Sequence, residues 1–341
     1  MTEQLHWSLA RAGVMTTANG LGYFAGAMVT APLARRLGTA ATFRLGMVLC
    51  GAALAATAAS GSYPALLVAR ASAGLGGALV FIAGAVLAPT AVYFAGTGLG
   101  IVLSGAAIPP LLDQHPDRWP IAWIGLAIAA GLATTVSWTA RTGHPAATSQ
   151  PPGPIRPLWP VVVAYLLFAA GYIAYITFLS AFLTNRHASP TQTALTWTLL
   201  GLAVLAAPSL WQRPIARWPD SRVLAALLCI LTASATLALL SPTPPGMIVS
   251  ALAYGATFMA VPAAVTALVR TATPTTKLTG TLATFTVVFA AGQTAGPWLA
   301  GILADHTGPA ATLGWTATLC GAAAVLAATA AAPKQAISGG Q

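Results

Sequence analysis

The sequence predicts an all-α integral membrane protein with helices in two bundles, and three observations predict it. Of the 341 residues, 57% are apolar and only 6% are charged, whereas a typical soluble domain carries about 25% charged residues. Apolar segments long enough to cross a bilayer recur along the whole chain. A polar, proline-rich stretch at 141–158 separates five such segments from six. A soluble globular protein is therefore excluded.

The predicted spans are bounded by charged residues or by clusters of Pro, Gly and Ser. In order, they cover residues 12–33, 44–60, 64–88, 91–111, 120–140, 159–183, 191–210, 222–240, 246–269, 279–303 and 310–332. Only Pro89 and Thr90 separate the third span from the fourth, and a proline can bend a membrane helix as well as end one.

The same pattern predicts the domain organisation. We expect a five-span bundle at 1–140, a flexible linker at 141–158, a six-span bundle at 159–333 and a tail at 334–341. The linker is rich in Pro and small polar residues, a composition typical of flexible segments.

Charge predicts the orientation of these spans, because basic loops are retained on the cytoplasmic side of a membrane. Alternate loops carry most of the basic residues: Arg35, Arg36, Arg44, Arg141, Arg156, Arg213, Arg217, Arg222, Arg270, Lys277 and Lys334. The opposite loops carry Arg11, Arg118 and Arg186. We therefore expect a cytoplasmic C-terminus, with residue 1 outside. The excess of basic residues is not interleaved with aromatics, so it does not predict a nucleic-acid-binding surface.

A short repeat indicates that the two bundles are related. Residues 32–38 read PLARRLG, and 214–220 read PIARWPD, 182 positions later. Each stretch precedes a span on the predicted cytoplasmic side, and parallel six-helix halves are a transporter architecture. In the first bundle the stretch follows the first span, whereas in the second it follows the second span. We therefore expect one further helix ahead of residue 12, so the coding frame upstream of Met1 should encode about 20 apolar residues.

Four stretches carry a resemblance to a known family. They are ANGLGYFAGA at 18–27, FAGTGLG at 94–100, Gly171-Tyr172 with TFL at 177–179, and GQTAGP at 292–297. With them the chain resembles the major facilitator superfamily and, within it, the YbfB/YjiJ branch. The resemblance implies a twelve-helix permease of two bundles in the bacterial inner membrane, monomeric and acting on a small molecule by alternating access.

Two superfamily motifs match position by position. In the loop motif G-x-L-A-D-R-x-G-R, Leu33, Ala34, Arg36 and Gly38 match, whereas Arg35 replaces the Asp. The resemblance implies a cytoplasmic gate formed by Arg35, Arg36 and Gly38 with Arg217. In the helix motif R-x-x-Q-G-x-G-x-A, matches fall at Arg70, Gly74, Gly76 and Ala78, and Ala73 replaces the Gln.

Arg70 is the leading candidate site residue, because a guanidinium in the bilayer core is costly and usually faces protein or water. One interpretation is a cavity charge that attracts an anionic solute. The alternative is a structural arginine that binds helix-end carbonyls or extends toward the membrane surface.

Tyrosines provide a second candidate, because Tyr165, Tyr172 and Tyr175 fall on one helical face. We interpret this face as the wall of a solute cavity; the alternative is packing between helices. Further polar residues in the spans extend the same argument: Tyr254, Thr257, Asn19, Tyr23 and Gln293. Gly22 with Gly26 and Gly292 with Gly296 form GxxxG faces, which favour close helix packing.

We expect a secondary transporter of a small polar or amphipathic solute, embedded in the lipid bilayer and without cofactor or metal. No catalytic triad, metal-ligand cluster or phosphate-binding loop is evident. Two alternatives stay open: a truncated or degenerate carrier that does not transport, and a polytopic membrane enzyme using Asp113, His115, Asp117 and Arg118.

Overall fold

The structure, a computed structural model, describes residues 7–87, 90–114, 116–139, 156–218 and 220–330. The first bundle contains α1 (Leu9–Leu37), α2 (Thr39–Ala59), α3 (Tyr63–Leu87), α4 (Thr90–Gln114), the 3-10 turn η1 (Pro116–Arg118) and α5 (Trp119–Ser137). The second contains the 3-10 turn η2 (Arg156–Leu158), α6 (Trp159–Asn185), α7 (Pro190–Arg217), α8 (Ser221–Leu240), α9 (Pro244–Phe258), α10 (Ala260–Ala272), α11 (Thr275–Thr307) and α12 (Ala310–Thr329). Most of the predicted linker, 141–155, and the predicted tail, 334–341, lie outside the described residues.

The predicted all-helical fold is confirmed, because every predicted span coincides with a helix or a pair of helices. Ten stretches of the described residues are long and apolar enough to cross a membrane. Helix α1 is not among these ten, although its 29 residues extend over about 44 Å. Several polar side chains, such as those of Thr16, Thr17 and Asn19, lie in the first half of α1.

The ninth predicted span, 246–269, is interrupted, because α9 ends at Phe258 and α10 begins at Ala260. Pro262 explains the interruption: its ring nitrogen carries no hydrogen for the carbonyl of Phe258, four residues earlier. Close by, the carbonyl of Ala256 accepts a hydrogen bond of 2.8 Å from the indole of Trp211 on α7. A side chain from a neighbouring helix thus binds the backbone at the interruption.

Helix pairing repeats between the two bundles. In the first bundle α3 packs against α1 and α2, and α2 packs against α5; in the second, α9 packs against α7 and α8, and α8 packs against α12. Helix α6 packs against α11 and α12. The helices equivalent to α11 and α12 are α4 and α5, which contact each other only slightly, and within the described residues no helix packs against both as α6 does.

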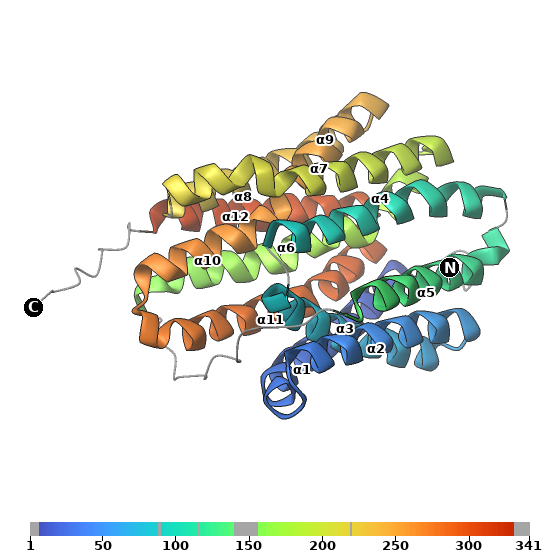
Figure 1. The fold of residues 1–341 in the computed structure, drawn as a ribbon. Helices are drawn as coiled ribbons and strands as arrows, with labels where there is room; N and C mark the ends of the chain where they lie inside the picture. The colour runs from blue at the N-terminus through green and yellow to red at the C-terminus, as the bar shows by residue number, and fades with distance from the viewer. Residues whose placement is uncertain (1–6, 88–89, 115, 140–155, 219, 331–341) are drawn as a thin grey trace, which may run out of the picture.

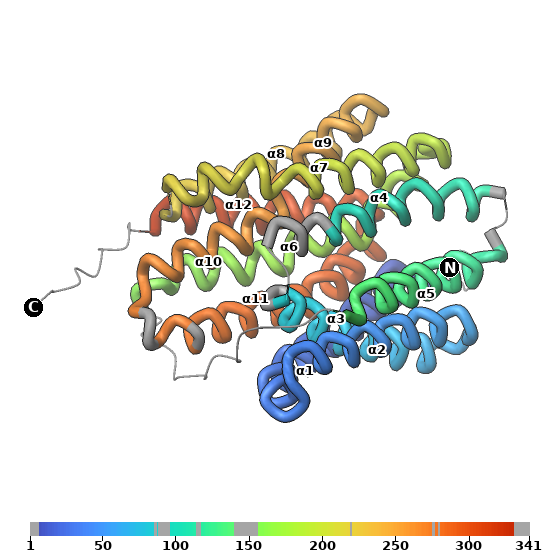
Figure 2. Tube along the Cα trace, viewed as in Figure 1, coloured from blue at the N-terminus to red at the C-terminus, as the bar shows by residue number. Residues whose placement is uncertain are grey.

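Figure 1 shows the consequence of this weak contact. Helices α1, α2, α3 and α5 form the lower group, whereas α4 lies above them, beside α7 of the second bundle. The tube in Figure 2 follows the same path, with teal α4 separated from green α5. Two helix pairs therefore connect the bundles, α1 with α11 and α4 with α7.

Small residues allow these pairs to approach closely, as GxxxG-type packing requires. A Cβ atom on Gly20 would lie 2.7 Å from Oγ1 of Thr294, and one on Gly98 would lie 2.7 Å from Cγ of Leu205. Along α1, the contacts with α11 come from residues 9–20, whereas Gly22 and Gly26 contact α3. Helices α1 and α11 thus meet at the end of the molecule where α1 begins and α11 ends, which we call the α1-start end, whereas α4 and α7 also meet near their middles, where Gly98 contacts Gly201 and Leu205.

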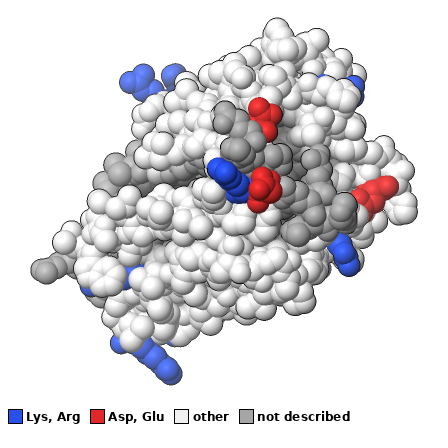
Figure 3. Space-filling view, turned by 90° about the vertical axis from the view of Figure 1, so that its right-hand side faces the viewer, with Lys and Arg blue, Asp and Glu red and all other residues white. Residues whose placement is uncertain are grey.

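Burial differs between the bundles. Helix α5 buries only Trp119 and Thr134, whereas the equivalent α12 buries seven residues. Large apolar side chains are exposed along one face of α5: Ile121, Ile124, Ile128, Leu132 and Val136. A surface of this kind suits hydrocarbon rather than water. Figure 3, which views the α1-start end, shows a mostly uncharged surface with few acidic and basic groups.

Candidate functional site

A group of polar side chains lies where the two bundles face each other. Tyr23 comes from α1, and Tyr165 and Tyr172 come from α6. The hydroxyl groups of these three residues lie within electrostatic range of one another. Tyr165 and Tyr172 are buried, and Tyr23 is half-buried. The structure thus brings together three predicted site residues from both sides of the bundle boundary.

Gln293 of α11 joins this group, because the hydroxyl of Tyr172 donates a hydrogen bond of 2.6 Å to its Oε1 atom. The bond depends on close packing of α11 against α6. A Cβ atom on Gly292 would lie 2.6 Å from the carbonyl oxygen of Leu166, and one on Gly296 would overlap the carbonyl of Ala170. We call Tyr23, Tyr165, Tyr172 and Gln293 the tyrosine cluster.

Aromatic rings surround the tyrosine cluster on the second bundle. The ring of Tyr172 stacks on Phe168 at 4.8 Å and on Phe289 at 5.7 Å between centroids. Tyr165 stacks on Phe289 at 5.2 Å, and Phe258 lies 5.9 Å from Tyr172. Phe168 and Phe258 are buried in the core of the second bundle, and Phe289 is half-buried. Aromatic rings beside hydroxyl and amide groups are a combination common in small-molecule sites.

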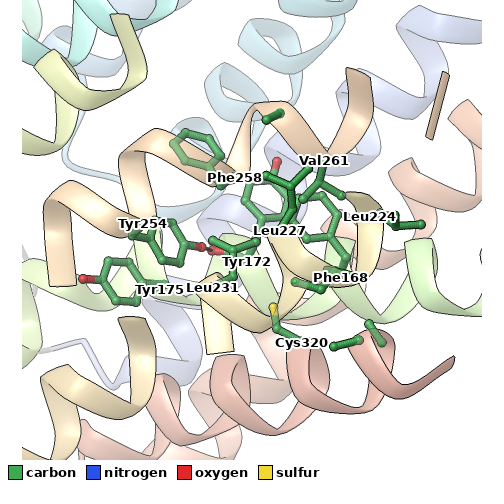
Figure 4. Packing of buried hydrophobic residues seen from close by; sticks show 14 of the residues in the cluster. Phe168, Tyr172, Tyr175, Leu224, Leu227, Leu231, Tyr254, Phe258, Val261 and Cys320 are labelled. Carbon is green, nitrogen blue, oxygen red and sulfur yellow. Dashed lines mark hydrogen bonds between the residues drawn. The ribbon is translucent and has the colours of Figure 1, made fainter. Parts of the chain in front are cut away.

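The predicted residues Tyr175 and Tyr254 lie beside Tyr172 but deeper inside the second bundle. Their rings stack at 3.9 Å between centroids, and both are fully buried. The hydroxyl of Tyr254 donates to the carbonyl of Tyr172 at 2.6 Å, as Figure 4 shows. Ser250 gives its own hydrogen to the carbonyl of Ser234 at 2.7 Å, so Tyr175 is the donor in its 2.8 Å bond to Ser250.

Two further predicted residues also satisfy their polar groups by local packing. The hydroxyl of Thr257 donates to carbonyls of its own helix, those of Ala253 and Tyr254, at 2.7 and 3.1 Å. The amide of Asn19 donates to the carbonyl of Arg70 at 3.1 Å and so connects α1 to α3. Neither group is directed at the tyrosine cluster.

Arg70 lies within the first bundle, between three of its helices. Its guanidinium donates to Oγ1 of Thr57 on α2 at 2.9 Å, and its Cζ atom lies 4.4 Å from the ring centroid of Trp123 on α5. The hydroxyl of Thr57 in turn donates a hydrogen bond of 2.7 Å to the carbonyl of Ala53. The Nε atom of Arg70 is buried without a hydrogen-bond partner among the described residues.

The sequence did not indicate these partners of Arg70. Thr57 and Trp123 are uncharged residues within apolar spans, and their contact with Arg70 depends on how the three helices are rotated about their axes. Asp305, which follows the predicted span 279–303 in the sequence, likewise gives no local sign that its carboxylate contacts the start of α1.

The predicted gate residues lie at the opposite end from the α1-start end. Arg35 and Arg36 are exposed in the last turn of α1, where positive charge complements the helix dipole. Gly38 follows with a φ of 86°, a conformation that favours glycine. Arg217 ends α7, with its Cζ atom 5.7 Å from the ring of Trp218.

An open apolar cavity of about 680 Å³ lies between α2 and α5. Its lining combines small residues such as Gly51, Ala55 and Gly131 with larger ones such as Met47 and Ile128. None of the predicted site residues lines this cavity. Among the described residues, no group of three or more His, Cys, Asp or Glu side chains could hold a metal ion.

Comparison with known proteins gives a family match over nearly the whole chain. Residues 1–332 match the family described as uncharacterised MFS-type transporter YbfB. No curated protein sequence matches the chain significantly.

Solved structures of transporters share the fold. The nucleoside transporter NupG (D323A mutant) is 12% identical, with a TM-score of 0.74 over 96% of this chain and 91% of that chain. The human organic anion transporter MFSD10 (TETRAN) is 17% identical, with a TM-score of 0.64 over 94% and 83%. A bacterial homologue of the human lysosomal transporter Spinster, inward-facing and unoccupied, is 14% identical, with a TM-score of 0.66 over 97% and 89%.

Proposed function

Because the chain belongs to the family described as uncharacterised MFS-type transporter YbfB, we propose that it carries a small polar or amphipathic solute across the membrane by alternating access. Membership makes the chain a multi-pass membrane protein. The alternative of a polytopic membrane enzyme is not supported, since the family and the structural neighbours are transporters.

The observation that carries this proposal is the tyrosine cluster. Tyr23 belongs to one bundle, and Tyr165, Tyr172 and Gln293 belong to the other. A solute held between them would contact both bundles, and relative movement of the bundles would then change its surroundings. Hydroxyl and amide groups beside stacked rings suit a solute with a planar ring and polar substituents, and nucleosides and organic anions are among the solutes that the structural neighbours carry.

Arg70 motivates a narrower proposal, a preference for anionic solutes. Its orphaned Nε atom keeps one buried donor available, and unpaired buried donors are uncommon in proteins. If Arg70→Ala left the transport of every accepted anion unchanged, this preference would be wrong.

The conformation supports a site that opens toward one side. The bundles meet through α1 residues 9–20 and the second half of α11, so closure lies at the α1-start end. By the charge of the loops we place this end outside and the Arg35–Arg217 end in the cytoplasm of a bacterial cell, in its inner membrane. The gate residues Arg35, Arg36, Gly38 and Arg217 would then flank the open side. We expect a monomer with a small-molecule substrate and no nucleic-acid partner.

The pairing of helices supports the proposal of two related halves, divided at the predicted linker. Helix α6 lies against α11 and α12, and no described helix has the equivalent place beside α4 and α5. We propose that a further apolar helix occupies that place in the working carrier. An in-frame apolar segment upstream of Met1 would support this, and its absence from the coding sequence would favour the eleven-helix chain.

Uptake into proteoliposomes tests the proposed function. The purified carrier, expressed with any in-frame apolar segment found upstream of Met1, is reconstituted and offered labelled nucleosides, aromatic carboxylates and other organic anions. We expect saturable uptake of at least one solute, and a decrease of about tenfold in Tyr172→Phe and Gln293→Ala, since each removes a polar group from the site.

Tyr175→Phe is the matched control, because its hydroxyl binds Ser250 inside the second bundle. Uptake equal in Tyr172→Phe and Tyr175→Phe would show that the tyrosine cluster does not bind the solute. Absence of uptake for every solute, with the chain folded, would favour the degenerate, non-transporting alternative.

A further inference from the structure

The carboxylate of Asp305 binds the first turn of α1 from the other bundle. Its Oδ1 atom accepts a hydrogen bond of 2.7 Å from the backbone N–H of Leu9, and its Oδ2 atom accepts one of 3.0 Å from that of Ala10. These N–H groups have no partner within the helix, and an anion there is favoured by the helix dipole. The side chain of Ser8, the N-cap residue, accepts a hydrogen bond only from the N–H of Arg11, at 3.2 Å. The carboxylate therefore completes the helix cap.

The start of α1 is also attached to its own bundle. The hydroxyl of Tyr63 on α3 donates to the carbonyl of Arg11 at 3.2 Å, and the Cζ atom of Arg11 lies 5.4 Å from the Tyr63 ring. The ring of Trp7 meets Tyr63 edge-on at 5.2 Å. These contacts keep the start of α1 with α3, so it moves with the first bundle. The bonds to Asp305 therefore cross the boundary between the bundles.

Most other contacts between α1 and α11 are of a different kind. The packing of Gly13 against Pro297 and of Gly20 against Thr294 is non-directional, and the hydroxyl of Thr17 makes a neutral hydrogen bond of 2.7 Å to the carbonyl of Thr294. A charge-assisted pair of bonds is stronger than a neutral one and depends more on its geometry. Separation of the two helices at this end must break that pair.

We propose that Asp305 is a positioning residue of the transport cycle, whose carboxylate holds the outer gate closed by capping α1 across the bundle boundary. The effect of this gate on transport rests on the proposed function, whereas the closed gate itself can be measured without transport. Neutralising Asp305 should move the protein toward a state open at the α1-start end.

The second bundle interface supplies a matched control. Helix α4 pairs with α7 as α11 pairs with α1, and Asp113 is an exposed acidic residue near the end of α4. Helix α7 begins with Pro190, whose nitrogen has no hydrogen to donate. Within the described residues, Asp113 makes no hydrogen bond to α7, so its neutralisation should leave the gate unchanged.

Distances between two spin labels at the α1-start end test the proposal. Labels are attached at Gly61→Cys, in the loop between α2 and α3, and at Thr191→Cys, in the first turn of α7, after alanine replaces the three native cysteines. Pulsed electron paramagnetic resonance then measures the distance between the two labels in lipid nanodiscs without substrate. The measurement reports the populations of short and long distances.

We expect Asp305→Asn to raise the long-distance population about fivefold, as the loss of one helix-charge interaction implies. Asp305→Glu should stay close to the parent, because it keeps the negative charge, and Asp113→Asn should match the parent. Thermal unfolding of each variant confirms that it is folded, and Asp305→Ala provides a second neutral variant, which also lacks the one bond that the asparagine carbonyl oxygen can still accept.

Unchanged distances in both Asp305→Asn and Asp305→Ala would overturn the proposal, as would an equal change in Asp113→Asn. The outcome is separate from that of the uptake assay. A shifted distance distribution in a chain without measurable uptake would support the gate contact and contradict the proposed transport. Uptake that depends on the tyrosine cluster, together with label distances that do not change when Asp305 is replaced, would support the proposed transport and contradict the gate contact.

Discussion

At the scale of single residues, the structure separates polar groups that bind neighbouring helices from polar groups that face the bundle boundary. Tyr175 and Tyr254 share a stacked pair and donate to Ser250 and to the backbone of Tyr172. Tyr172 instead donates to Gln293 beside Tyr23 of the other bundle. Bonds inside one bundle stabilise the fold, whereas we propose that the polar groups beside the other bundle bind a solute.

Arg70→Ala is expected to lower the free energy of unfolding by about 2 kcal/mol, because one guanidinium holds α3 to both α2 and α5. The estimate combines a desolvated cation–π contact with a hydrogen bond to a charged group. Thermal unfolding in detergent measures the change. Arg186→Ala is the control, since that arginine is exposed at the end of α6, with its Cζ atom 5.4 Å from the Phe182 ring. A smaller loss in Arg70→Ala than in Arg186→Ala would contradict the structural role.

Sequence reasoning singled out Arg70, Tyr172 and Gln293 as candidates, because polar residues are rare in apolar spans and therefore conspicuous. It could not separate Tyr175 from Tyr172, since residues three apart share a helical face and only the neighbouring helices decide what each hydroxyl meets. The contact of Asp305 with Leu9 lies 296 residues apart in the chain, and nothing in the local sequence encodes such a pairing.

At the scale of helices, composition predicted where each element lies, because apolar length sets the spans. The ninth span is interrupted near Pro262, a proline that is evident in the sequence. The sequence did not decide whether this proline bends the helix or breaks it, because a proline can bend a membrane helix without ending it. Helix α1 packs against α3 through glycines, and this contact follows the GxxxG pattern at Gly22 and Gly26. Close approach here depends on the absence of side chains on both helices.

Gly74→Ala is expected to destabilise the protein by about 1 to 3 kcal/mol, the usual cost of overpacking. A Cβ atom there would overlap the carbonyl of Asn19 and lie 2.8 Å from the backbone nitrogen of Tyr23. Unfolding midpoints in detergent provide the measurement.

Gly77→Ala is the matched control on the same helix, because no atom lies within 4 Å of its Cβ position. Alanine favours helix over glycine by about 1 kcal/mol, so this variant should be neutral or slightly stabilised. Equal midpoints for the two variants would contradict the packing of α1 against α3.

At the scale of the whole molecule, the two bundles share a helix pairing but differ in burial. The hydrophobic core consists largely of residues from α6 to α12, including Phe168, Leu227 and Val261. In the first bundle α2 and α5 line an open cavity, and α4 lies against the second bundle. The duplicated order of spans was visible in the sequence, whereas this imbalance was not, because it depends on which helices touch.

Hydrogen exchange should reveal the difference in burial between the two bundles. Backbone amides of α5 are expected to exchange roughly tenfold faster than those of the equivalent α12, since few buried contacts oppose local opening of α5. Mass spectrometry of the reconstituted protein measures both helices in one sample, and both lie at the periphery of their bundles. Equal protection would show that lipid contact compensates for the missing protein contacts.

The bond between the Trp211 indole and the Ala256 carbonyl has a mechanical consequence. The indole of Trp211, on α7, binds the carbonyl of Ala256, two residues before α9 ends. Helix α7 also packs against both α9 and α10. Tilting of α7 should therefore displace this neighbouring span close to its break, with the end of α9 drawn along by a directional bond as well as by packing.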